Sequence, residues 1–157
     1  MSTALFIVIT AMLVQQAFAY FAALVLPNMA PAVAADLGID PNLIGYYTGL
    51  LYFCSSFGQL SCGGFILRFG AVRMSQISLL MMGAALMLGY LGAIWAFAVG
   101  AMIIGVGSSV STPASSHLLA RYSPPKYAPL IFSVKQTGVP VGGLMAGMLI
   151  PLLLGWI

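Results

Sequence analysis

The sequence predicts an all-α membrane protein with five membrane-spanning helices. Hydrophobic residues make up 62% of the 157-residue chain and charged residues only 4%, whereas soluble domains carry about 25% charged residues. A helix that crosses a bilayer needs about 20 mostly apolar residues, and five such runs lie between the few charges and prolines. We expect one membrane domain (1–157) with spans at about 3–26, 43–66, 74–94, 96–119 and 128–154.

The first span has some features of a secretory signal peptide, because Ala17-Phe18-Ala19 resembles a cleavage site. However, no Lys or Arg precedes the apolar run, and the run continues past this site to residue 26. We therefore expect the segment to remain as a helix. Its polar residues include Gln16 and Tyr20, which share one helix face because they are four residues apart.

The basic residues predict how the chain is oriented. Arg68 and Arg73 lie between the second and third spans, and Arg121 and Lys126 lie between the fourth and fifth. The first loop contains acidic but no basic residues. Because Lys and Arg are enriched in cytoplasmic loops, we expect a multi-pass protein of the cell (inner or plasma) membrane with a cytoplasmic N-terminus.

The fourth span is rich in hydroxyl groups around Pro113, where hydroxyls can satisfy backbone groups that a proline frees. An intramembrane enzyme would need a serine such as Ser108 within hydrogen-bond reach of His117 as its base. These residues are nine positions apart on one helix, about 13 Å along its axis. We expect no enzymatic activity, no cofactor and no metal site, and the absence of a basic tail argues against nucleic-acid binding.

Lys135 is the most informative residue of the fifth span. It follows Lys126 by nine residues, or about 13 Å of helix, and a lysine at that depth costs about 3 kcal/mol on insertion scales. The predicted spans contain no Asp or Glu, so an anionic group of a solute is a natural counter-charge. Backbone carbonyls, a lipid head group or an acid in another segment are the alternatives.

Glycines form a smooth stripe on the same span. Gly138 and Gly142 are four residues apart, as are Gly143 and Gly147, and such pairs let another helix approach closely. Pro140 lacks a backbone donor and favours a bend. The stripe serves helix packing, transport-linked bending, or both.

Polar residues of the first and fifth spans form our candidate substrate site. Lys135 and the adjacent Gln136 lie on the fifth span, and Gln16 and Tyr20 lie on the first. Lys135 falls on the glycine-rich side of its helix, which is expected to face the bundle rather than lipid.

The segment between the second and third spans, GGFILRFGAVR, resembles the signature loop of the major facilitator superfamily. Gly63, Arg68 and Gly70 match the family's glycine, arginine and second glycine, and Arg73 adds a positive charge just beyond the usual basic pair. The family's acidic position is Leu67 here, which removes a charge contact that latches the two halves of family members. The alternative interpretation of this segment is a tight glycine turn that obeys the positive-inside rule.

Two further segments are similar to the superfamily: the exit of the first span (26–39) and the glycine- and proline-rich stretch 138–143. The resemblance implies twelve helices in two six-helix halves, with the substrate site between the halves and helices one, four and five beside it. The chain then corresponds to the N-terminal half without its sixth helix. It implies alternating-access transport of a small solute and a partner in a missing C-terminal half or a second membrane chain, and Lys135 favours an anion as that solute. The alternative is a structural or assembly subunit that transports nothing itself.

Overall fold

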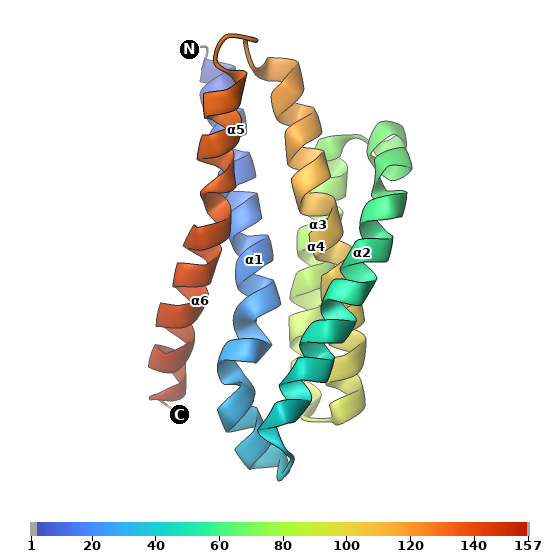
Figure 1. The fold of residues 1–157 in the computed structure, drawn as a ribbon, viewed down its shortest axis with the longest axis vertical. Coiled ribbons are helices and arrows are strands. Elements are labelled where there is room, and N and C mark those ends of the chain that lie inside the picture. The colour runs from blue at the N-terminus through green and yellow to red at the C-terminus, as the bar shows by residue number, and fades with distance from the viewer. Residues whose placement is uncertain (1–2, 157) are drawn as a thin grey trace.

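The computed structural model describes residues 3–156 as a bundle of helices, without a strand in that range (Figure 1). Residues 1, 2 and 157 of the expected domain lie outside this description. Five segments are long and apolar enough to cross a membrane, which confirms the all-α membrane class. The elements are α1 (Thr3–Leu37), η1 (Pro41–Leu43), α2 (Ile44–Phe69), α3 (Ala71–Leu88), η2 (Gly89–Leu91), α4 (Ile94–Tyr122), α5 (Ala128–Gln136) and α6 (Gly138–Leu154).

Helix α1 is longer than the span expected from the sequence. It continues beyond residue 26 through Pro27 and Pro31 to Leu37. Proline removes an intrahelical donor, but membrane helices tolerate it when the freed groups find other partners. Between the two prolines, the Asn28 side chain donates a hydrogen bond of 2.8 Å to the Leu24 carbonyl, which is not one of the two carbonyls that the prolines leave without a donor.

The connection between α1 and α2 is correspondingly short. Gly38 adopts a φ of +62°, a left-handed conformation that ends helices and suits glycine. Asp36 therefore lies in the last turn of α1 and not in a loop as expected. Asp40 accepts a 2.8 Å hydrogen bond from the Asn42 backbone and caps η1.

Helix α4 forms the centre of the bundle, packed against α2, α3 and α1. Close approach depends on its glycines. A Cβ at Gly105 would collide with the Leu51 carbonyl of α2, and one at Gly107 would lie 2.9 Å from the Met82 side chain of α3. Ser78 of α3 also donates a 2.7 Å hydrogen bond to the Gly107 carbonyl.

The fifth span is divided into two helices. Helix α5 ends at Gln136 and α6 begins at Gly138, and both lie along α1 on the side away from α2 (Figure 1). Pro140 explains the break because it cannot donate to the Gln136 carbonyl and its ring crowds that turn. Thr137, at the junction, donates its hydroxyl to the Val134 carbonyl at 2.6 Å.

The two basic connections lie at the same end of the bundle as the start of α1 (Figure 1). This end carries four basic residues: Arg68, Arg73, Arg121 and Lys126. Asp36 and Asp40 lie at the opposite end, where α1 meets α2. The charges of the chain are thus sorted along the bundle axis, with Lys135 alone between the two ends.

Candidate functional site

Lys135 is buried deeply for a charged side chain. It is 1% exposed, and it is the largest of the side chains in residues 3–156 that are less than 2% exposed. Its ammonium group has no hydrogen-bond or ion-pair partner within that part of the chain. Lys135 lies in the last turn of α5, where the negative end of the helix dipole favours a cation.

Two adjacent glutamines of α1 face α4. The side-chain nitrogen Nε2 of Gln15 donates to Ser111 Oγ at 2.8 Å, and that of Gln16 donates to Thr112 Oγ1 at 3.2 Å. Both glutamines are buried, at 4% and 3% exposed. Their carbonyl oxygens Oε1 are buried and have no hydrogen-bond partner in the described residues.

Packing on either side of Lys135 places it level with these glutamines. One turn before it, Ile131 belongs to the same buried cluster as Met12 of α1 and Leu119 of α4. Just after it, Gly138 lies so close to α1 that a Cβ there would be 2.9 Å from Gln16 Cβ. Lys135 shares the face of these two residues, so its side chain enters the α1–α4–α5 interface at the height of residues 12–16. We call Lys135, Gln15, Gln16 and Ser111 the polar cluster.

Tyr20 and Gln136 lie at the edge of this arrangement. Tyr20 is 36% exposed, one turn beyond Gln16, and its hydroxyl lies near that of Tyr52 on α2. Gln136 is exposed on the outside of α5 although Lys135, its neighbour, is buried. The structure therefore brings Gln16 and Lys135 to one interface, places Tyr20 on an open face beside it, and turns Gln136 away.

The glycines of α6 differ in what they contact. A Cβ on Gly142 would collide with the Ala17 carbonyl and lie 2.9 Å from Tyr20 Cβ. A Cβ on Gly143 would lie 3.8 Å from the Leu24 side chain, and one on Gly147 would meet nothing within 4 Å outside its own helix backbone. Close packing of α6 on α1 thus uses Gly138 and Gly142, and Pro140 between them is exposed.

The signature-like segment forms a turn of a single residue. Gly70 has a φ of +85° and separates α2 from α3. Its backbone N–H bonds to the Ile66 carbonyl at 2.9 Å, and its carbonyl accepts from Met74 at 3.1 Å. Arg68 and Arg73 are exposed, and within residues 3–156 neither has an acidic partner.

A family model described as Major Facilitator Superfamily matches residues 8–157. The chain belongs to the major facilitator superfamily. Comparison with curated proteins and with solved structures gives no significant match. The superfamily consists of transporters, so membrane transport of a small molecule is the function class of this chain, in agreement with the expectation that it is not an enzyme.

Membership in the superfamily gives the polar cluster a defined place. Each half of a superfamily transporter is built from two inverted repeats of three helices. In this chain α1 opens the first repeat and α4 opens the second, so the bonds of Gln15 and Gln16 join the two opening helices. The contact is central to the half and not peripheral.

Pairing between α1 and α4 was not predictable from this superfamily sequence. Gln15 and Gln16 stand out because two adjacent amides interrupt an apolar span, and Ser111 lies in a hydroxyl-rich stretch. Only the register of the two helices makes them partners 96 residues apart. The sequence carries no local signal for that register.

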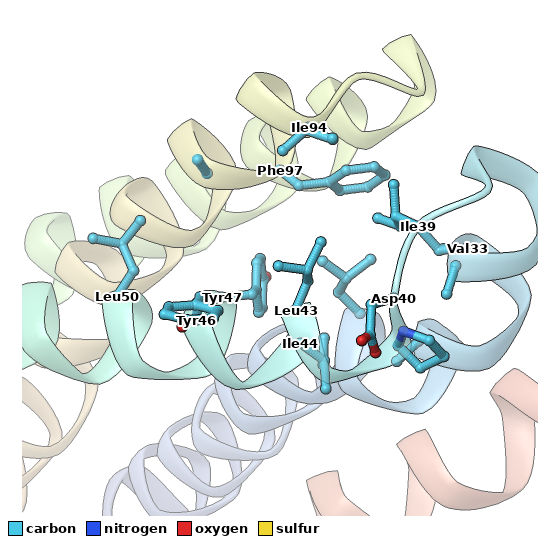
Figure 2. Close-up of a pocket in the computed structure, with 15 residues that line it drawn as sticks. Val33, Ile39, Asp40, Leu43, Ile44, Tyr46, Tyr47, Leu50, Ile94 and Phe97 are labelled. Atoms are coloured by element: carbon cyan, nitrogen blue, oxygen red, sulfur yellow. The ribbon is translucent and has the colours of Figure 1, made fainter.

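The cavities lie elsewhere in the bundle. One of about 180 Å³ lies between α1, α2 and α4 at the end of the bundle where α1 meets α2. Tyr46 and Tyr47 line one side of it and Phe97 faces them (Figure 2). A second, of about 530 Å³, lies between α1, α3 and α4 near Asp36, and a third, of about 200 Å³, separates α2, α3 and α4 around Gly58. None of these three includes Lys135 or Gln16.

Proposed function

We propose that this chain provides helices one to five of an alternating-access secondary transporter that moves a small anionic solute. The observation that carries this proposal is the burial of Lys135, which is 1% exposed and has no acid near it in the described residues. Intramembrane ionisable residues in transporters commonly mark the path of a substrate or ion. An anionic solute supplies the negative charge that would neutralise Lys135.

The distribution of charge supports an anion over a cation. The chain has five Lys and Arg residues and two acids, and both acids lie at the far end of the bundle. Among the described residues, Lys135 carries the only formal charge within the polar cluster. A cationic solute would meet repulsion there without a compensating carboxylate.

The open face beside the cluster is where the rest of the transporter is expected. Tyr20 is exposed on that side, next to the seam at which Gly142 packs on α1. Substrate sites in this superfamily lie at the interface of two repeats or halves near the membrane midplane. We propose that Tyr20 and Gln136 face a second set of helices, on the same polypeptide or on another membrane chain.

The same proposal assigns an orientation and a membrane. The end that carries Arg68, Arg73, Arg121 and Lys126 faces the cytoplasm, because basic residues are retained on that side. The N-terminus is then cytoplasmic, and the cavities near Asp36 face outward. The protein resides in the inner or plasma membrane of the cell.

Uptake measurements on reconstituted protein test the role of Lys135. The intact protein is placed in liposomes, and uptake of ¹⁴C-labelled pyruvate, lactate and alanine and of ³²P-phosphate is measured. We expect Lys135→Gln to lower uptake of the transported anion at least tenfold. The matched control is Lys126→Gln, which removes an exposed charge at the membrane surface and leaves uptake unchanged. Undiminished uptake by Lys135→Gln would exclude the anion contact and favour a structural role for this lysine.

A further inference from the structure

The carbonyl oxygens of Gln15 and Gln16 are two buried hydrogen-bond acceptors with no donor. Each side chain is more than nine-tenths buried, and neither Oε1 has a partner in the described residues. A buried polar group left unpaired destabilises the protein, because it has lost its hydrogen bonds to water. Each Oε1 atom gains a hydrogen bond only if another group supplies an N–H or O–H donor.

Both glutamines bond α4 through their amide nitrogens. Gln15 and Gln16 both use Nε2 to bond α4 hydroxyls, at 2.8 and 3.2 Å. The Ser115 hydroxyl in turn donates to the Ser111 carbonyl at 2.7 Å, so the stretch of α4 that receives Gln15 is itself held. In this arrangement each amide leaves its oxygen, and not its nitrogen, without a partner in the described residues.

The donor and acceptor groups of this interface complement one another. Lys135 supplies up to three N–H donors without an acceptor, and the two glutamines supply acceptors without a donor. Packing of Ile131 and Gly138 puts all three at the same height of α1. One small molecule with an anionic group and a nearby donor satisfies both sets.

We propose that the solute is a carboxylate that carries a hydroxyl or ammonium donor on the adjacent carbon, and that Gln15 and Gln16 are the residues that read this donor. This inference rests on the proposed contact between Lys135 and the anionic group. A plain carboxylate neutralises Lys135 and leaves both amide oxygens unpaired. A 2-hydroxy or 2-amino acid offers the missing N–H or O–H within the span of one small ligand.

A matched series of ligands tests this inference without any mutation. Acetate, propionate, butyrate and hexanoate are compared with their 2-hydroxy and 2-amino derivatives. Each compound is added to the purified full chain, and thermal unfolding is followed by tryptophan fluorescence; dissociation constants follow from the dependence of Tm on ligand concentration. We expect at least one substituted acid to bind about tenfold more tightly than its parent. Absence of any such preference across the series overturns the proposal.

Variants separate this inference from the function on which it rests. Gln15→Met and Gln16→Met keep most of the side-chain volume but remove the acceptor, so they are expected to abolish the preference for the substituted acid while plain-acid binding persists. Gln59→Met is the matched control, because Gln59 is exposed and donates only to Ser55 of its own helix, at 3.5 Å. Loss of all carboxylate binding in Lys135→Gln supports the proposed function whichever way the glutamine variants behave. If tighter binding of the substituted acids survives both glutamine substitutions, Gln15 and Gln16 do not recognise the donor and the proposal is refuted.

Discussion

Substitution of Gly142 by alanine tests the packing of α6 against α1. The added Cβ would collide with the Ala17 carbonyl and lie 2.9 Å from Tyr20 Cβ and 3.0 Å from the Phe21 backbone nitrogen. These atoms are backbone or attached directly to it, so relief requires that the two helices separate. Overpacking of this kind costs about 1–3 kcal/mol, while the higher helix propensity of alanine returns up to about 1 kcal/mol. We expect a net loss of about 1–2 kcal/mol.

Thermal unfolding of the purified protein in detergent measures this loss, with Gly147→Ala as the control. Gly147 lies five residues further along α6, and a Cβ there would meet nothing within 4 Å outside its own helix backbone. Alanine at this position therefore gains helix propensity without a collision. For a chain of this size 1 kcal/mol corresponds to about 2–4 °C in Tm, and Gly142→Ala should unfold at least about 2 °C below the control. Equal Tm values for the two variants would refute the close approach of α6 to α1.

Three further predictions concern other parts of the bundle. Gly70→Ala should cost about 1–3 kcal/mol because its φ of +85° suits only glycine, whereas Gly64→Ala in the preceding helix should not destabilise; a Tm comparison decides. Ser111→Ala removes a hydrogen bond between α1 and α4 and should lower stability by about 0.6–2 kcal/mol, and an unchanged unfolding curve would contradict that bond. A cysteine at Lys126 should be shielded from a membrane-impermeant maleimide in intact cells and one at Asn42 should react; the reverse pattern would invert the proposed orientation.

Composition and hydropathy were sufficient to predict the fold class. With only 4% charged residues, the few charged positions mark the segments that can form loops outside the membrane. The bounds of α1 were harder to predict. Prolines at 27 and 31 are typical of a helix end, yet α1 runs through both to Leu37, and Gly38 supplies the actual stop. A membrane relaxes the local rule against proline that applies in water.

The candidate site was only partly predictable. Sequence indicated that Lys135 faces the glycine side of its helix, and its burial agrees with that direction. The two glycine pairs looked equivalent, but only at Gly138 and Gly142 is α1 so close that a Cβ would come within 3.0 Å of it. Which atoms face each other across two helices depends on register and rotation, and neither is encoded in spacing along one helix.

Pro140 links the shape of the fifth span to the charge within it. Because it cannot donate to Gln136, α5 ends there and Lys135 falls in its last turn. A cation at a partly buried helix C-terminus gains up to about 2 kcal/mol, which is less than the roughly 3 kcal/mol that an intramembrane lysine costs. The helix end therefore offsets most of the cost of Lys135 but not all of it.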